Sequence, residues 1–161
     1  MDNTRLASGL VFMASIGSGI VAGVFFAFSS FVMAALGRIS PPQAVAAMNS
    51  INITALNPGF MTPFVGTGVL SLVAGVRSPF LWNHTGTGLV PLPSLVYLLG
   101  CFAATIFLNV PLNNRLASIT DPAAAIAFRP QYLKAWTTWN RLRTIAAALS
   151  AILFTVALCR S

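Results

Sequence analysis

The feature that most constrains the fold is the length of the stretches that contain no ionisable side chain. No Lys, Arg, Asp, Glu or His occurs in residues 6–37 or 39–76, and His84 is the only one in residues 78–114. A helix needs about 20 mostly apolar residues to cross a bilayer. Each interval is long enough for one such helix and a loop. The sequence therefore predicts a single integral membrane domain over residues 1–161.

The composition agrees with this interpretation and excludes a nucleic-acid-binding function. Only 7% of the 161 residues are charged, against about 25% in soluble proteins. The net charge is +7, which in a soluble chain would point to nucleic acid. Here the basic residues are scattered at the ends of expected helices, where they suit lipid headgroups. We expect the lipid bilayer as a partner and no nucleic acid, and the sequence leaves the oligomeric state open.

The pattern predicts an all-α bundle of four membrane-spanning helices, with short interfacial helices in the first and third loops. The expected spans are residues 6–36, 58–76, 93–110 and 136–158. The third should stop at Pro111, because the residue before a proline avoids helical angles. A short helix after Asp121 should likewise end near Pro130. In the first span, small residues recur every fourth position and predict a face for close helix approach: Ser15, Gly19, Gly23 and Ala27.

The distribution of basic residues indicates an orientation. One end of the bundle carries three of them (Arg5, Arg77, Arg160), and the other carries six (Arg38, Arg115, Arg129, Lys134, Arg141, Arg143). Cytoplasmic loops carry the excess of Lys and Arg. We therefore expect the first and third loops in the cytoplasm and both termini outside or in the lumen. The membrane would be that of the endoplasmic reticulum in a fungus and the inner membrane in a bacterium.

The polar residues gather in three short segments, residues 52–57, 109–114 and 136–143, all on the side with six basic residues. Polar groups at membrane depth are costly and tend to serve a function. Only 16 residues separate Arg143 from Arg160, which is about 24 Å of helix and less than the ~30 Å hydrocarbon core. The fourth helix thus needs its first turns to complete the crossing. Arg141 and Arg143 should lie at or just inside the interface.

Trp136, Asn140 and Arg143 share one helical face, because they are spaced i, i+4 and i+7. If this face looks into the bundle, it meets Asn109 and Asn113 at the end of the third helix. The result would be a pocket for a flat hydrophobic ligand that carries carbonyl or phenol oxygens. Three structural alternatives stay open, and one is that the Asn residues beside Pro111 serve only to form a turn. Trp, Arg and Asn at a helix start also suit an interfacial belt and an N-cap, and the phenylalanines of residues 25–31 suit core packing.

Several kinds of catalytic site are excluded by what the chain lacks. One His, two distant Cys and two Asp are too few for a zinc, di-iron or copper site of ordinary ligand count. His84, a loop residue, has no buried acid for a catalytic triad, and no nucleotide-binding glycine motif occurs. We expect no bound metal and no organic cofactor.

Five segments carry a resemblance to a known family, and together they cover nearly the whole chain: residues 23–33, 47–52, 57–60, 109–113 and 136–144. In order and spacing they resemble the anthrone oxygenase family of small four-helix membrane proteins. The chain departs from the family pattern at Ala34, a position often held by proline, and in a longer second loop. The resemblance implies conversion of a polyketide anthrone to an anthraquinone, with O2 as co-substrate. It also implies a hydrophobic aromatic substrate.

The resemblance and the polar segments together assign roles to individual residues. Expected catalytic residues, which stabilise a substrate anion or donate hydrogen bonds to it, are Arg143, Arg141, Asn109 and Asn140. Expected substrate-binding residues are Asn113, Trp136, Trp139, Asn52, Asn57 and Phe28. The general base stays open between Tyr132 and an activated water. Two other functions also stay open, a non-catalytic carrier or partner protein for hydrophobic metabolites and an isomerase or cyclase that uses the same enolate without O2.

Overall fold

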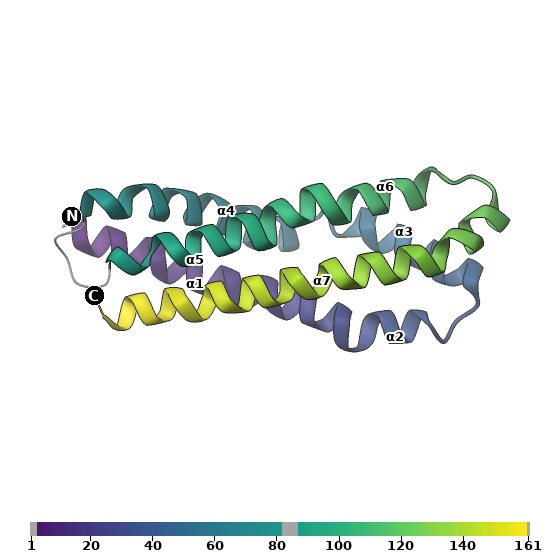
Figure 1. Ribbon diagram of the computed structural model, residues 1–161, viewed down its shortest axis with the longest axis horizontal. Helices are drawn as coiled ribbons and strands as arrows, with labels where there is room; N and C mark the ends of the chain where they lie inside the picture. The colour runs from purple at the N-terminus through teal and green to yellow at the C-terminus, as the bar shows by residue number, and fades with distance from the viewer. Residues whose placement is uncertain (1–2, 82–86, 161) are drawn as a thin grey trace.

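The computed structural model describes residues 3–81 and 87–160, which are helical almost throughout (Figure 1). Four helices are long and apolar enough to cross a membrane: Arg5–Leu36, Pro58–Arg77, Pro91–Ser118 and Pro122–Cys159. The predicted all-α polytopic bundle is therefore confirmed. His84 lies outside the described residues.

The first and third spanning helices each combine α-helical and π-helical segments. The first runs through α1 (Asn3–Ala27), the π segment η1 (Phe28–Val32) and α2 (Met33–Leu36). The third runs through α5 (Pro91–Leu95), the π segments η4 (Val96–Ala103) and η5 (Thr105–Asn109), and α6 (Val110–Ser118). Single π turns inside helices are rare and recur at functional sites.

The remaining helices begin at residues that favour a helix start. The Ser40 and Gln43 side chains form a capping box ahead of α3 (Pro41–Thr54). The Asn57 side chain accepts a hydrogen bond from Phe60 N–H at the start of α4 (Pro58–Arg77). Asp121 caps α7 (Pro122–Cys159) in the same way. Two short 3₁₀ turns, η2 (Ser78–Leu81) and η3 (Thr87–Leu89), flank the part of the second loop that is not described.

Two predicted helix ends are wrong, because helices continue through both prolines. The third helix extends past Pro111 to Ser118, since Pro111 lies in the first turn of α6, where a missing backbone N–H costs little. The segment expected as a separate short helix before Pro130 is instead the beginning of α7. A proline inside a helix costs about 3 kcal/mol, and the apolar face that α7 buries on both sides of Pro130, at Phe128 and Tyr132, offsets that cost.

The molecule divides along its length into a membrane bundle and an extension. α7 has 38 residues, or about 57 Å of helix, nearly twice the ~30 Å hydrocarbon core. The 18 residues between Arg141 and Arg160 span about 27 Å, close to the thickness of that core. The first third of α7 packs with α3 and α6 in the extension, at the right of Figure 1. The extension has its own core, made of Leu36, Met48, Leu116, Phe128, Tyr132 and Trp136.

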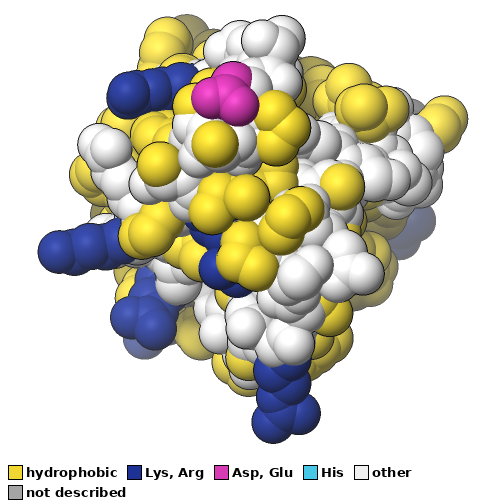
Figure 2. All heavy atoms as spheres, turned by 90° about the vertical axis from the view of Figure 1, so that its right-hand side faces the viewer, with side chains coloured by type: hydrophobic (Ala, Val, Ile, Leu, Met, Phe, Trp, Pro, Cys, Tyr) yellow, Lys and Arg dark blue, Asp and Glu magenta, His cyan; other side chains and the backbone are white. Residues whose placement is uncertain are grey.

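The end of the extension is basic. Figure 2 looks onto this end and shows Lys and Arg side chains projecting around the rim, with one acidic side chain among them. Asp121 is the acidic residue at this end of the sequence, in the loop between α6 and α7. The basic residues here include Arg38, Arg115 and Arg129. The asymmetry of charge between the two ends therefore survives in the folded molecule.

The small-residue face predicted for the first helix is wrong at Gly19 and Gly23, whereas Ser15 does lie against α7, where its Oγ donates to the Ala151 carbonyl at 3.1 Å. Added Cβ atoms at Gly19 and Gly23 would meet nothing within 4 Å, whereas one at Gly100 would lie 2.6 Å from the Ala146 Cβ. Residues spaced by four drift about 40° per step around a helix of 3.6 residues per turn. A spacing of strictly four therefore leaves the packing face. The buried face of α1 alternates steps of three and four: Val11, Ala14, Ser18, Val21 and Phe25.

Candidate functional site

A cavity of about 380 Å³ lies where the membrane bundle meets the extension. This volume falls within the range of small-molecule sites. Its walls come from all four spanning helices and from α3. The lining residues are Val24, Phe25, Phe28, Met48, Ile51, Asn52, Thr54, Ala55, Leu56, Asn57, Phe60, Met61, Phe64, Thr105, Val110, Asn113, Trp136 and Arg143. Most are apolar or aromatic, and Arg143 is the one charged side chain among them.

Arg143 is buried in the cavity wall, with 4% of its surface exposed. Its Nη2 donates to Asn140 Oδ1 at 2.8 Å, and its Nη1 donates to Thr105 Oγ1 at 3.3 Å. The guanidinium carbon lies 4.2 Å from the centre of the Phe25 ring and 5.4 Å from that of Trp136. Its Nε is buried without a partner. The cation is therefore held by neutral groups and aromatic faces.

The charge of Arg143 has no nearby counter-ion among the residues that the structure describes. Among the described residues the one acidic side chain is that of Asp121, which caps the N-terminal end of α7, far from Arg143. A buried cation without a paired anion is costly. An anionic or strongly polarised oxygen in the cavity would lower that cost. The site thus favours a ligand that carries, or can acquire, negative charge.

Asn140 lies behind Arg143 and fixes its orientation. The Asn140 Nδ2 donates to the Phe25 carbonyl at 2.8 Å and to Ser29 Oγ at 2.7 Å. The side-chain oxygen therefore faces Arg143. Asn140 is fully buried and does not line the cavity. It acts on a ligand only through Arg143.

Asn109 likewise lies behind the wall, and it joins the third helix to α7. Its Nδ2 donates to the Trp136 carbonyl at 3.2 Å. The Trp136 ring faces the cavity and packs on Phe28, with ring centres 5.5 Å apart. The Trp136 Nε1–H is buried without a partner. An indole N–H is a hydrogen-bond donor only, and this one is left unsatisfied inside the protein.

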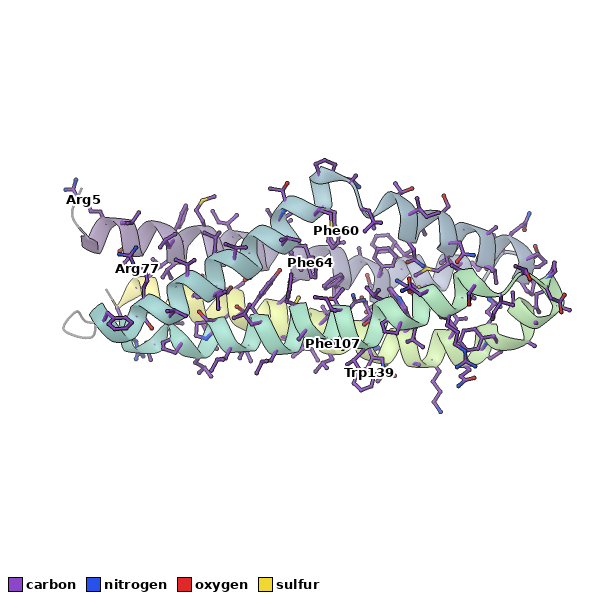
Figure 3. All side chains as sticks on the ribbon, turned by 90° about the horizontal axis from the view of Figure 1, so that it is seen from above. Arg5, Phe60, Phe64, Arg77, Phe107 and Trp139 are labelled. Carbon is purple, nitrogen blue, oxygen red and sulfur yellow. The ribbon has the colours of Figure 1, made fainter. Side chains whose placement is uncertain are left out.

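Further amides line the side of the cavity nearer the extension. Asn113 Oδ1 accepts a 2.9 Å hydrogen bond from the Tyr132 hydroxyl. Asn52 also lines the cavity, and its side-chain amide lies beside the Tyr132 hydroxyl. On the opposite side the wall is aromatic. The Phe60 and Phe64 rings stack with centres 5.7 Å apart, and both point from α4 toward the third helix (Figure 3).

The structure gathers eight of the ten residues expected at the site. Six line the cavity and two lie directly behind it; the six are Phe28, Asn52, Asn57, Asn113, Trp136 and Arg143. Arg141 and Trp139 do not line the cavity and do not lie behind its wall. Arg141 is exposed, and Trp139 is half-buried and lies on the outer side of the bundle in Figure 3. Arg141 is two residues from Arg143, which places it on the opposite face of α7.

Sequence reasoning missed Thr105, Ser29, Phe60 and Phe64. Thr105 precedes Asn109 by four residues, so the helical period could have identified it as a neighbour of Arg143. No comparable signal marks the phenylalanines, which look like ordinary core residues in the sequence. In the described ranges, no three His, Cys, Asp or Glu side chains come together in a group that could hold a metal ion.

These features define a polytopic membrane protein with an aromatic cavity and one buried cation at a membrane boundary. The family described as anthrone oxygenase matches residues 10–153. The chain therefore belongs to the anthrone oxygenase family. No curated protein and no solved structure matches it.

Proposed function

We propose that this protein is an oxygenase that converts a polyketide anthrone to an anthraquinone with O2 and needs neither a metal nor an organic cofactor. The observation that carries the proposal is Arg143, a buried cation without a carboxylate partner on the wall of an aromatic cavity. A flat aromatic ketone that ionises on losing a proton fits both features. Membership of the anthrone oxygenase family supports the same substrate class.

The chemistry needs no electrons from the protein. An anthrone has a methylene group between two aromatic rings, and loss of one proton gives a delocalised phenolate-like anion. This anion passes one electron to O2, and the two radicals combine to form a carbon–oxygen bond. The resulting peroxide loses water and leaves a carbonyl group. One anthrone and one O2 thus give one anthraquinone and one water.

Arg143 would stabilise the anion, because a fixed cation in a water-poor site favours developing negative charge. Asn140 and Thr105 hold its guanidinium in place. The Trp136 and Phe28 rings would pack against the substrate rings. The Asn52 amide and the Trp136 indole would supply hydrogen bonds to the substrate oxygens. Tyr132, bonded to the cavity residue Asn113, stays a candidate for the base together with an activated water. Arg141 and Trp139 have no part in this mechanism.

The test is turnover of emodin anthrone by detergent-purified, chelator-treated protein under air and under argon. Spontaneous oxidation is subtracted with a no-protein control. We expect quinone formation that requires O2 and falls about 10²–10³-fold in Arg143→Leu, the loss typical of one removed anion-stabilising group. The matched control is Arg141→Leu, which removes an exposed charge two residues away and should keep its activity.

Each other outcome points to a different function. Saturable binding without turnover would indicate a carrier of hydrophobic metabolites. Conversion under argon would indicate an isomerase or cyclase that uses the same anion. Turnover abolished by the chelator and restored by a metal would contradict the cofactor-free mechanism.

A further inference from the structure

We propose that the cavity exchanges its ligand with the lipid bilayer, through a mouth formed by the α3–α4 corner (residues 54–57) and Val110. The alternative is entry from water through the extension. The proposal concerns the route to the cavity. It holds whether the ligand is a substrate or a cargo, and so it does not depend on the proposed oxygenase activity.

The exposure of the lining residues locates the mouth. Most of them are buried or half-buried, and those classed as exposed are Thr54, Leu56, Asn57 and Val110. Leu56 has 70% of its surface exposed and Val110 has 38%. Leu56 and Asn57 lie in the short connection between α3 and α4, and Thr54 is the last residue of α3. The cavity therefore reaches the molecular surface at this corner.

The corner lies at the depth where hydrocarbon meets headgroups. α4 has 20 residues between Asn57 and its last residue, Arg77. At 1.5 Å per residue this is about 30 Å, one hydrocarbon thickness. Figure 3 shows Arg77 at the same end of the bundle as Arg5, which places the start of α4 at the opposite boundary. The mouth thus opens at the edge of the bilayer core.

The residues around the mouth suit contact with lipid. Leu56 in the corner and Ile53 just before it are large exposed apolar side chains, and residues 39–76 contain no ionisable group. Asn57 satisfies the backbone of the turn, since its Nδ2 donates to the Thr54 carbonyl at 2.7 Å and its Oδ1 accepts from Phe60 N–H at 3.2 Å. Backbone groups must be paired to lie against hydrocarbon. A corner of this kind can rest in the membrane and keep the mouth formed.

The side of the cavity toward water is closed by packed side chains. Met48 and Trp136 line the cavity and also belong to the core of the extension, together with Leu36, Leu116 and Tyr132. A ligand that came from water would have to pass through this core. A hydrophobic ligand dissolved in the bilayer would meet only the exposed mouth.

Quenching of Trp136 fluorescence tests the route. Trp82→Phe and Trp139→Phe leave Trp136 as the sole tryptophan, and the protein is reconstituted in phosphatidylcholine vesicles. A doxyl-labelled alkane dissolved in the bilayer should quench Trp136, whereas iodide in the water should not. Replacing Leu56 and Val110 by Phe, singly and together, should reduce alkane quenching severalfold because the mouth narrows. Both positions are exposed, so the larger side chains can be accommodated.

The control variants place the same bulk beside the mouth. Ile53→Phe lies on the same corner and Ile106→Phe on the same helix as Val110; both residues are exposed, and neither lines the cavity. Quenching in these variants should equal that of the parent protein. Three results would overturn the proposal: quenching by iodide in place of the alkane, quenching by neither, and alkane quenching that the Leu56 and Val110 variants leave unchanged.

Discussion

The Arg143 guanidinium donates a 2.8 Å hydrogen bond to the side-chain oxygen of Asn140, one helical turn earlier on α7. The same Asn140 side chain donates to the Phe25 carbonyl and to Ser29 Oγ on the first helix. One amide therefore joins the first and fourth helices and aims the cation of the site. Removing one member of such a buried network leaves its partners unpaired, so a substitution at Asn140 acts on Arg143 as well.

Asn140→Asp tests whether the activity depends on the free charge of Arg143. The new carboxylate would pair with Arg143 and remove the uncompensated charge that favours a ligand anion. We expect anthrone turnover to fall about 10²–10³-fold, as when an oxyanion-stabilising group is lost. Stability should fall by only about 1–3 kcal/mol, because a carboxylate oxygen replaces the amide that donates to the Phe25 carbonyl. Steady-state turnover and the thermal unfolding midpoint are measured together. Asn114→Asp, an exposed change in α6, is the control, and full activity in Asn140→Asp would contradict the role given to Arg143.

Trp136→Phe and Trp139→Phe form a matched pair on neighbouring faces of α7. Trp136 lines the cavity with an unpaired indole N–H, and Trp139 does not line it. A phenylalanine at position 136 keeps the aromatic ring in the cavity wall but lacks the indole N–H. A hydrogen bond from that N–H to the ligand would contribute about 0.5–1.5 kcal/mol. We expect a severalfold weaker affinity for the anthraquinone product in Trp136→Phe alone, measured by titration. Equal affinities in the two variants would show that the indole N–H does not contact the ligand.

Gly100→Ala and Gly23→Ala should differ in the sign of their effect on stability. An added Cβ at Gly100 meets the Ala146 Cβ at 2.6 Å, so the third helix and α7 must move apart. Overpacking of this kind costs about 1–3 kcal/mol. At Gly23 nothing lies within 4 Å, and alanine favours the helix by up to about 1 kcal/mol. Thermal unfolding in detergent measures the stability of both variants. A loss of stability in Gly23→Ala would mean that the face of α1 at Gly23 packs against another helix.

The sequence predicts which residues of the site share a face, because that depends only on the helical period. Trp136, Asn140 and Arg143 are all buried toward the bundle, as their spacing indicates. The same period excludes Arg141 from this face, although its position at the interface made it a candidate. Composition and span lengths suffice for the number of helices. These features are local, and the sequence specifies them directly.

The parts that the sequence did not predict depend on contacts between distant segments. Pro111 and Pro130 look like helix ends, yet the helices continue through both. Pro111 lies in the first turn of α6, and at Pro130 the packing of Phe128 and Tyr132 offsets the lost hydrogen bond. The close approach at Gly100 depends on its partner being Ala146, which lies 46 positions later in the chain. The cavity itself depends on how α3 packs against α6 and α7 in the extension, and no local pattern encodes that arrangement.

Thr105 is the second group that positions Arg143, and its removal should reduce activity less than a change at Asn140. Its Oγ1 accepts from Arg143 at 3.3 Å and donates to the Cys101 carbonyl at 2.8 Å. Thr105→Val keeps the shape but leaves one guanidinium N–H unpaired, at a cost of about 1–3 kcal/mol. We expect turnover to fall about 10-fold, since 1.36 kcal/mol corresponds to a factor of ten. Thr105→Ser keeps the hydroxyl and should restore most of the activity.

A double-mutant cycle distinguishes this positioning role from a general loss of stability. If Thr105 and Asn140 both act through Arg143, adding Thr105→Val should cost little, because in Asn140→Asp the carboxylate already cancels the free charge of the guanidinium. The turnover of Thr105→Val combined with Asn140→Asp should then resemble that of Asn140→Asp alone. Effects that multiply in the double variant would show that the two residues act on the reaction independently. In that case Thr105 would contact the substrate itself, which its place in the cavity wall also permits.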